Sequence, residues 1–334
     1  MTLPHHFQKR LSLPVIAAPL FLASGPKLVL ACCRAGIIGT LPAKNQRTLA
    51  GFEEWLNEIC DGLASIERET GFPPAPFGVN LIVHQTNKNL KKELDLCVKY
   101  RVPLIITSLG AVSRVVDKVH NYGGIVFHDV ISSRHAQKAA EAGVDGLIAV
   151  AAGAGGHTGL ANPFALVNEI RDFFDKTVLL AGALSTGADI AAALTMGADL
   201  AYLGTRFLAT KEGLSEQNYK KMIVESNLTD IKSTAAVSGI NANFLQKSLH
   251  RAGIDINEPI RHSILDIDKD LAEAFTEKSD TYKPWRDIWS AGQGVGSIND
   301  IPSVEQLVSR LRDQYHSAIK SQQIKKSRLI SRPK

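Results

Sequence analysis

Eight short apolar or β-branched runs, each followed by an amphipathic or Ala-rich stretch, constrain the fold of this chain more than any other feature. This alternation is expected for a parallel sheet whose strands are joined by helical crossovers. An open doubly wound sheet has no reason to stop at eight strands, so we expect an α/β chain folded as a closed (β/α)8 TIM barrel. The eight expected strands are Val15–Ala18, Gly36–Thr40, Pro76–Leu81, Pro103–Ser108, Gly124–Asp129, Gly146–Val150, Val178–Ala181 and Ala201–Leu203.

The domain organisation follows from where this alternation stops. We expect residues 1–212 to form the barrel and residues 213–300, which are irregular and partly helical, to be an insertion or cap over the active site. Residues 301–320 should be a C-terminal helix on the barrel, because apolar residues such as Val304, Leu307 and Leu311 recur at three- and four-residue steps. Residues 321–334 are expected to be a disordered basic tail.

Composition and charge exclude several classes of protein. Hydrophobic residues are 45% and charged residues 21% of the 334 residues, which is ordinary globular usage rather than that of a disordered or fibrous chain. No apolar run approaches the roughly 18 residues of a membrane span, and the first ten residues lack the apolar core of a signal peptide, so a cytoplasmic protein is expected. The formal net charge of the chain is +5, and residues 317–334 contain six basic residues and no acidic residue. Without this terminal segment the net charge is about −1, so no nucleic-acid partner is expected. The four cysteines include no CxxC and have no histidine at ligand spacing, so no metal is expected.

Barrel enzymes place their chemistry where the strands end, so the residues after each expected strand are the candidate site. This rule selects Pro19, Asn80, Ser108, His128 with Asp129, the loop 153–159, Gly182 and Gly204. The loop contains Gly155, Gly156 and a single ionisable side chain, His157. Glycines let backbone approach a ligand, and an imidazole can move a proton near neutral pH, so His157 is the candidate catalytic group. The alternative is a flexible loop with an incidental histidine.

Two consecutive strand ends have glycines suited to an anion. Gly182 with Ala183 follows the seventh run, and Gly204 with Thr205 follows the eighth, which is where barrels commonly bind phosphate through backbone N–H groups. Two tight turns are the alternative reading. A GxGxxG after the first strand and a GxxxxGK[ST] are both lacking, so neither a Rossmann nucleotide site nor a P-loop is expected.

Ordered motifs across residues 14–210 make the chain resemble a known family. These motifs are Ala17-Ala18-Pro19-Leu20, Phe77-Gly78-Val79-Asn80-Leu81, Gly143-Val144-Asp145, Gly155-Gly156-His157-Thr158-Gly159, Ala181-Gly182-Ala183, Gly197-Ala198-Asp199 and Gly204-Thr205-Arg206-Phe207-Leu208-Ala209-Thr210, with Trp289-Ser290-Ala291-Gly292-Gln293-Gly294 following later. The chain thereby resembles the nitronate monooxygenases, formerly 2-nitropropane dioxygenases, which are FMN-dependent barrel enzymes related to the flavin-dependent enoyl-ACP reductases.

The resemblance implies roles for individual residues. The backbone of Ala18, Pro19 and Leu20 would face the flavin ring, and Asn80 would hydrogen-bond it. Gly182, Ala183, Gly204 and Thr205 would bind the FMN phosphate. His157 would lie beside the flavin as the catalytic base, and Gln293 would close over the substrate from the C-terminal cap.

Three positions depart from the family pattern. Leu20 stands where the family often has Met, and Gly153 precedes Ala154 where the family often has Glu. Some relatives carry a Lys at the end of the fifth strand, whereas Asp129 stands here beside His128. His128 is expected either to make a polar contact in the cofactor site or to be a structural histidine bonded to Asp129.

The resemblance implies FMN-dependent oxidative denitrification of alkyl nitronates or nitroalkanes with O2, yielding a carbonyl compound and nitrite, with His157 as the base. The alternative is an NAD(P)H-dependent FMN reductase acting on quinones or enoyl thioesters. A non-catalytic FMN-binding protein is a third reading. The partners are then a small-molecule substrate and O2, with or without NAD(P)H, and the chain is either a monomer or a homodimer.

Overall fold

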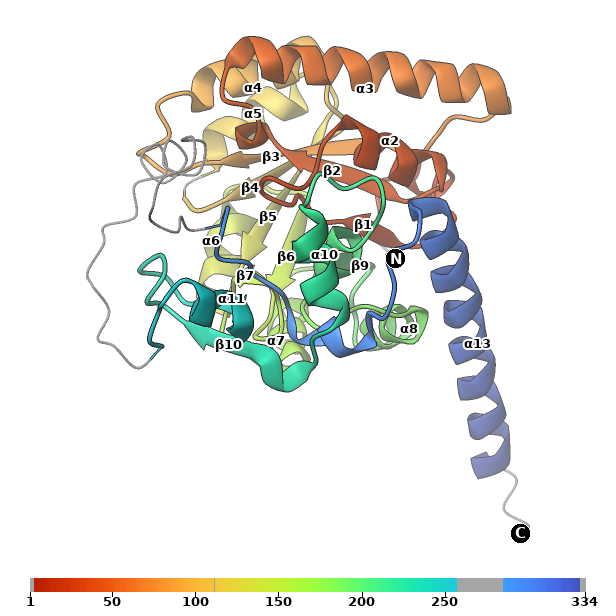
Figure 1. Cartoon of the computed structure of the whole chain (residues 1–334). Helices are drawn as coiled ribbons and strands as arrows, with labels where there is room; N and C mark the ends of the chain where they lie inside the picture. Colours follow the sequence, from red (N-terminus) through yellow and green to blue (C-terminus); the bar gives the residue numbers. More distant parts are fainter. Residues whose placement is uncertain (1–2, 111, 257–284, 331–334) are drawn as a thin grey trace.

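Eight parallel strands close into a barrel in this computed structural model, which describes residues 3–110, 112–256 and 285–330 (Figure 1). The ring closes where β1 pairs with β9 through Ile16 and Tyr202. The predicted (β/α)8 barrel is therefore confirmed, and each strand lies within two residues of its predicted bounds. In ring order the strands are β1 (Val15–Ala17), β2 (Ile38–Pro42), β3 (Phe77–Ile82), β4 (Leu104–Ser108), β5 (Ile125–Val130), β6 (Gly146–Val150), β8 (Thr177–Ala181) and β9 (Leu200–Leu203).

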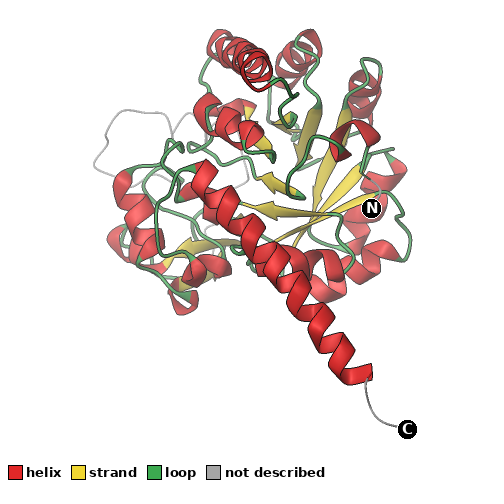
Figure 2. Ribbon diagram, turned by 90° about the vertical axis from the view of Figure 1, so that its right-hand side faces the viewer, coloured by secondary structure: helices red, strands yellow, loops and turns green. Residues whose placement is uncertain are grey.

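Helices join successive strands and surround the barrel (Figure 2). They are α2 (Pro26–Arg34), α3 (Leu49–Thr70), α4 (Leu90–Lys99), α5 (Ser113–His120), α6 (Ser133–Glu141), α7 (Pro163–Arg171) and α8 (Gly187–Thr195). Local sequence sets their starts: Ser132 and Thr186 accept hydrogen bonds from the first turns of α6 and α8. Within the described parts of the chain, no helix is long and apolar enough to cross a membrane.

The core has an inner and an outer layer because side chains alternate along each strand. Leu104, Ile106 and Phe127 belong to the cluster inside the barrel. Ile105 and Val126, one residue away, pack in the layer between the strands and the helices. The helix α1 (His5–Gln8) contributes the fully buried Phe7 to the inner cluster, so the chain before β1 fills part of the barrel interior.

The chain after β9 adds structure to the barrel mouth. It forms α9 (Thr205–Leu208), α10 (Gln217–Val224), η2 (Leu228–Asp230), β10 (Ile231–Thr234), β11 (Ala242–Leu245) and α11 (Gln246–Arg251), followed after the undescribed stretch by η3 (Gln293–Ser297). β11 pairs antiparallel with both β10 and the short β7 (Gly156–His157). This second sheet therefore ties the loop after β6 to the expected cap region. Residues 257–284 of that region lie outside the described residues.

The last helix, α13 (Val304–Ile330), is longer than predicted. Its expected end at residue 320 is wrong, because neither glycine nor proline interrupts 304–330 and the added residues are mostly good helix formers. The helix packs along α8 and then extends beyond the body of the molecule (Figure 1). Residues 331–334 of the expected tail lie outside the described residues.

Gly187 allows the close packing of α8 against α13. A Cβ at this position would lie 2.2 Å from the carbonyl oxygen of Leu311, and the Gly187 N–H donates to Gln314 Oε1 at 2.9 Å. We expect Gly187→Val to destabilise the protein by roughly 1–3 kcal/mol or more through overpacking, measured as a fall in the urea midpoint. The matched comparison is Ala188→Val on the same helix. A substitution at another glycine such as Gly123 would not serve, because its positive φ strains any other residue. An unchanged midpoint for Gly187→Val would contradict this packing.

Candidate active site

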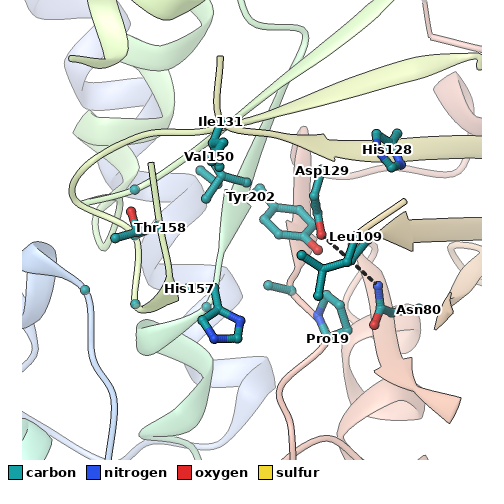
Figure 3. A pocket seen from close by; sticks show the side chains of 18 of the residues that line it. Pro19, Asn80, Leu109, His128, Asp129, Ile131, Val150, His157, Thr158 and Tyr202 are labelled. Atoms are coloured by element: carbon teal, nitrogen blue, oxygen red, sulfur yellow. Dashed lines mark hydrogen bonds between the residues drawn. The ribbon is translucent and has the colours of Figure 1, made fainter. Parts of the chain in front are cut away.

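A cavity of about 820 Å³ opens at the carboxyl ends of the barrel strands (Figure 3). This volume lies in the range of about 300–1,000 Å³ that holds small molecules and cofactors. Most of the predicted site residues line it together: Ala18, Pro19, Leu20, Asn80, Ser108, His128, Gly155, His157, Gly182, Ala183, Gly204 and Thr205. Gly156 and Gln293 do not line it, although the neighbours Gly292 and Gly294 do.

Three polar side chains on neighbouring strands form the floor of this cavity. Asn80 Nδ2 donates to Ser108 Oγ at 2.8 Å and to the Ile106 carbonyl at 3.3 Å. Ser108 Oγ in turn donates to Asp129 Oδ2 at 2.5 Å. Both hydrogens of the Asn80 amide are thus used, which leaves its amide oxygen to accept from an N–H donor in the cavity.

Asp129 is the most perturbed group on the floor. Burial raises the pKa of its carboxyl to about 6, against a smaller lowering by the Ser108 hydrogen bond. Tyr202, which also lines the cavity, has its pKa raised well above the usual range by burial and by Asp129, so its hydroxyl stays neutral. Asp129 Oδ1 is buried and has no hydrogen-bond partner. One oxygen of the Asp129 carboxyl is therefore buried without a hydrogen-bond donor.

His128 faces away from this floor. Neighbouring residues on a strand point to opposite sides, so Asp129 lies inside the barrel and His128 lies outside (Figure 3). The imidazole Nδ1 lies 2.8 Å from Thr107 Oγ1, and burial lowers the pKa of His128 to about 4. The expectation that His128 bonds Asp129 is wrong for this steric reason. His128 lines only an outer arm of the cavity, with His135 and Lys138 of α6.

His157 is held in the short strand β7. Asn243 on β11 supports the loop before it, donating to the carbonyls of Ala152 at 2.8 Å and Ala154 at 2.7 Å. The imidazole packs edge-on against Trp285 with the ring centroids 4.9 Å apart. Burial lowers the pKa of His157 to about 4, so the ring is neutral at neutral pH. A neutral ring has a lone pair with which to accept a proton.

Ser238 is the hydrogen-bond partner of the His157 ring. Its Oγ lies 3.1 Å from His157 Nε2 and 3.3 Å from the Ile240 carbonyl oxygen. A serine hydroxyl has one proton, so in the arrangement where that proton goes to the carbonyl, Nε2 donates to Ser238 Oγ and the lone pair is on Nδ1.

The glycines of the 153–159 loop serve backbone packing as well as ligand approach. A Cβ on Gly155 would lie 2.7 Å from the Gly292 nitrogen, and one on Gly153 would lie 2.9 Å from Ala183 Cβ. The Gly153 carbonyl accepts from the N–H groups of Ala183 at 3.1 Å and Gln293 at 2.9 Å. The side chain of Gln293 is exposed, and its Oε1 would lie 3.3 Å from a Cβ on Gly153.

Gly204 and Thr205 form a wall that could accept an anion. A Cβ on Gly204 would meet only Leu20 and Ala18, at 3.6 and 3.8 Å, so the protein itself does not require glycine there. Thr205 Oγ1 accepts from the Gly292 N–H at 2.9 Å, which leaves its hydroxyl proton free to donate. Ala183 has an unusual φ of 57°, and its N–H is already bonded to Gly153, so it shapes the wall without offering that donor.

Asn45 fixes the loop after β1, which forms another wall. Its amide donates to the carbonyls of Leu20 at 2.9 Å and Ser24 at 2.7 Å, and its oxygen accepts from the Leu22 N–H at 2.9 Å. Leu22 has a φ of 58°, which is uncommon for a residue with a side chain. Asn45 therefore stabilises a strained turn that presents Pro19 and Leu20 to the cavity.

Comparison with known proteins places this site in a family. The model of the family described as nitronate monooxygenase matches residues 6–314. The chain belongs to the nitronate monooxygenase family. The resemblance drawn from its motifs is therefore confirmed.

Individual relatives of this nitronate monooxygenase family member differ in what they act on. The chain is 25% identical to the nitronate monooxygenase of Paraburkholderia phytofirmans, over 92% of this chain and 93% of that protein. It is 28% identical to the (3aS,4S,5R,7aS)-5-hydroxy-7a-methyl-1-oxo-octahydro-1H-indene-4-carboxyl-CoA dehydrogenase of Rhodococcus jostii, over 71% of this chain but only 63% of that protein. The fold is like that of the nitroalkane oxidase of Streptomyces ansochromogenes, with a TM-score of 0.75 at 22% identity over 94% and 98% of the two chains.

Several residues of the site escaped sequence reasoning. Ser238, Asn243 and Asn45 act on other residues through hydrogen bonds between segments far apart in the chain, and no local motif marks them. Tyr202 was predicted only as part of a strand, and the alternation along β9 that turns it inward was the available signal. Among the described residues, no group of three or more His, Cys, Asp or Glu side chains could hold a metal ion.

Proposed function

We propose that this protein binds FMN in the cavity and oxidises alkyl nitronates or nitroalkanes with O2 to a carbonyl compound and nitrite. The observation that carries the proposal is a neutral His157 facing a cofactor-sized cavity in a member of the nitronate monooxygenase family. Bound flavin would supply the redox chemistry. The chain supplies binding, orientation and proton transfer.

The residues present fit FMN. The wall at Gly204 has space where a side chain would otherwise lie, and the Thr205 hydroxyl can donate to a phosphate oxygen. The free amide oxygen of Asn80 suits an N–H of the flavin ring. The loop from Ala18 to Leu20 gives an apolar wall against which a flat ring can pack. We infer that the region 213–300 acts as a cap, because Ile240, Ser290 and Gly292 complete the cavity lining.

His157 is proposed to act as the base toward neutral nitroalkanes. Its Nδ1 lone pair accepts the α-proton while Nε2 remains bonded to Ser238. The nitronate formed is an anion, and an anion beside the ring favours the imidazolium that results. A substrate supplied as nitronate has already lost this proton, so His157 then contributes only hydrogen bonding.

A second candidate function is reduction of acyl thioesters by NAD(P)H, or the reverse dehydrogenation with oxidised nicotinamide as the electron acceptor. It is favoured by the named activity of the Rhodococcus jostii relative and by the outer arm of the cavity, where Lys138 and His135 are exposed. The Lys138 ammonium group suits the phosphates of a nucleotide-bearing substrate. The two functions share a flavin site and differ in the electron donor.

The decisive experiment is a visible spectrum of the purified protein followed by anaerobic mixing with propyl-2-nitronate, NADH or NADPH. The proposal expects a flavin spectrum that nitronate bleaches and nicotinamides leave unchanged, with nitrite released once O2 is admitted. Bleaching by a nicotinamide alone would favour the second candidate. A colourless protein that takes up no FMN on reconstitution would contradict both.

Ser238 provides a separate test of how His157 is positioned. We expect Ser238→Ala to lower kcat with nitroethane about tenfold while leaving FMN affinity unchanged, because the hydrogen bond orients the ring without touching the cofactor wall. Ser238→Thr keeps a hydroxyl and should recover most of the rate. Steady-state kinetics and fluorescence titration with FMN measure the two quantities, and a loss of FMN affinity in Ser238→Ala would contradict the assignment.

A further inference from the structure

The buried oxygen of Asp129 has no role in the hydrogen bonding of the protein. Asp129 Oδ2 accepts from Ser108, but Oδ1 has no partner although it is inaccessible to solvent. A buried carboxyl oxygen without a donor is costly, so it indicates a group that is completed by a ligand or by a proton. Asp129 lines the cavity beside Tyr202 (Figure 3).

Among the described residues, the side chains that face Asp129 are uncharged. Ser108 and Asn80 face it from β4 and β3 as neutral dipoles, and Tyr202 faces it from β9 as a neutral phenol. The other ionisable side chains in the described cavity lining belong to the second sheet or to the outer side of the barrel. They are His157 on β7, which is neutral, and His128, His135 and Lys138 on the outer arm.

We propose that Asp129 takes up one proton each time the flavin bound above it is reduced by two electrons, and releases that proton on reoxidation. The proposal rests on the flavin site proposed above. Oxidised flavin, two electrons and one proton give the reduced flavin anion, and the Asp129 carboxylate with a second proton gives the carboxylic acid. The electrons come from the substrate or another reductant, and O2 takes them away.

Electrostatics drives this coupling. With its pKa raised to about 6, Asp129 is largely ionised at pH 7 before reduction. A second negative charge arriving within the same cavity disfavours the carboxylate, so the carboxyl pKa moves through neutral pH and the proton binds. A cation at this position would instead stabilise reduced flavin without taking up a proton.

The test compares FMN-loaded wild type with Asp129→Asn by two readouts that do not depend on turnover. Redox-difference infrared spectra should show the C=O stretch of a protonated carboxylic acid appearing on dithionite reduction of the wild type and absent in the variant. Between about pH 6 and 8, the reduction potential of the wild type should fall more steeply with pH than that of Asp129→Asn. The extra slope should be about 30 mV per pH unit, which corresponds to one more proton per two electrons.

Two further variants make the result decisive. Ser108→Ala removes the hydrogen bond that stabilises the carboxylate, so proton uptake should move to higher pH, and this keeps the test valid if Asp129→Asn fails to fold. Asp95→Asn, an exposed partner of Lys118, is the matched control and should behave as the wild type. Equal slopes and no carboxylic acid band in the reduced wild type would overturn the proposal. Failure of the protein to load FMN would instead contradict the proposed function, and it is seen before either measurement.

Discussion

Replacing His157 by Asn is expected to lower kcat/KM with neutral nitroethane by about 10²- to 10⁴-fold, the usual contribution of a general base. Asn keeps hydrogen-bonding capacity at a similar place but cannot accept and hold the α-proton. The effect with preformed ethyl nitronate should be far smaller, because that substrate has already lost the proton. Nitrite release measured with both substrates gives the ratio that identifies the base.

The pH profile supports the same assignment with a definite sign. The active base is the neutral imidazole, which is lost as pH falls through the pKa of His157 in the folded protein. Because burial lowers that pKa to about 4, kcat/KM with nitroethane should stay level from pH 8 to about pH 5 and fall only below it. An acid limb near the usual histidine pKa of about 6.5 would show that the ring is solvated in the working enzyme.

The matched control for His157 is His120, a histidine on α5 that pairs with Asp145 on the far side of the outer layer. His120→Asn should leave both substrates turning over at the wild-type rate. Equal losses with nitroethane and with its nitronate in His157→Asn would mean that the residue binds or orients the substrate rather than accepting its proton.

The barrel was predictable because its information is local. Each strand is an apolar run of few residues, and several crossover helices have their own start signal, such as Thr186 before α8. The strand-end rule then identified Asn80, Ser108 and Gly204 as neighbours in space without any contact being known. Counting runs does not show which face of a strand a residue takes, and for this reason one of the two alternatives for His128, a bond to Asp129, is wrong.

The support of the site was not predictable because it depends on contacts between distant segments. Ser238 meets His157 across 81 positions of sequence, and Asn243 meets Ala152 across 91. The β10–β11 hairpin creates both contacts, and although Ser238-Gly239 marks its turn, nothing local shows that the hairpin packs on the His157 loop. The charge state of Asp129 likewise follows from burial, which no spacing reveals. Side chains that line the ligand site lie at strand ends, which the fold makes predictable. The side chains that orient them are placed by tertiary contacts, which the sequence does not show.

Gly204→Val is expected to abolish cofactor binding while leaving the fold intact. A Cβ at this position meets Leu20 and Ala18 only at ordinary contact distances, and the φ of −100° suits any residue, so the cofactor-free protein should unfold within about 0.5 kcal/mol of wild type. The added isopropyl group lies in the space assigned to the FMN phosphate. We expect FMN affinity to fall at least about 100-fold, about 2.8 kcal/mol, by fluorescence titration of stripped protein.

Gly213→Val is the control, because Gly213 also has space around it but lies outside the cavity lining. It should keep wild-type FMN affinity. The melting temperature gives an independent check, since a ligand that binds only the folded state stabilises it. Added FMN should raise the melting temperature of wild type and Gly213→Val but not that of Gly204→Val. A Gly204→Val protein that binds FMN as tightly as wild type would show that the phosphate binds elsewhere and that cofactor binding does not require glycine at this position.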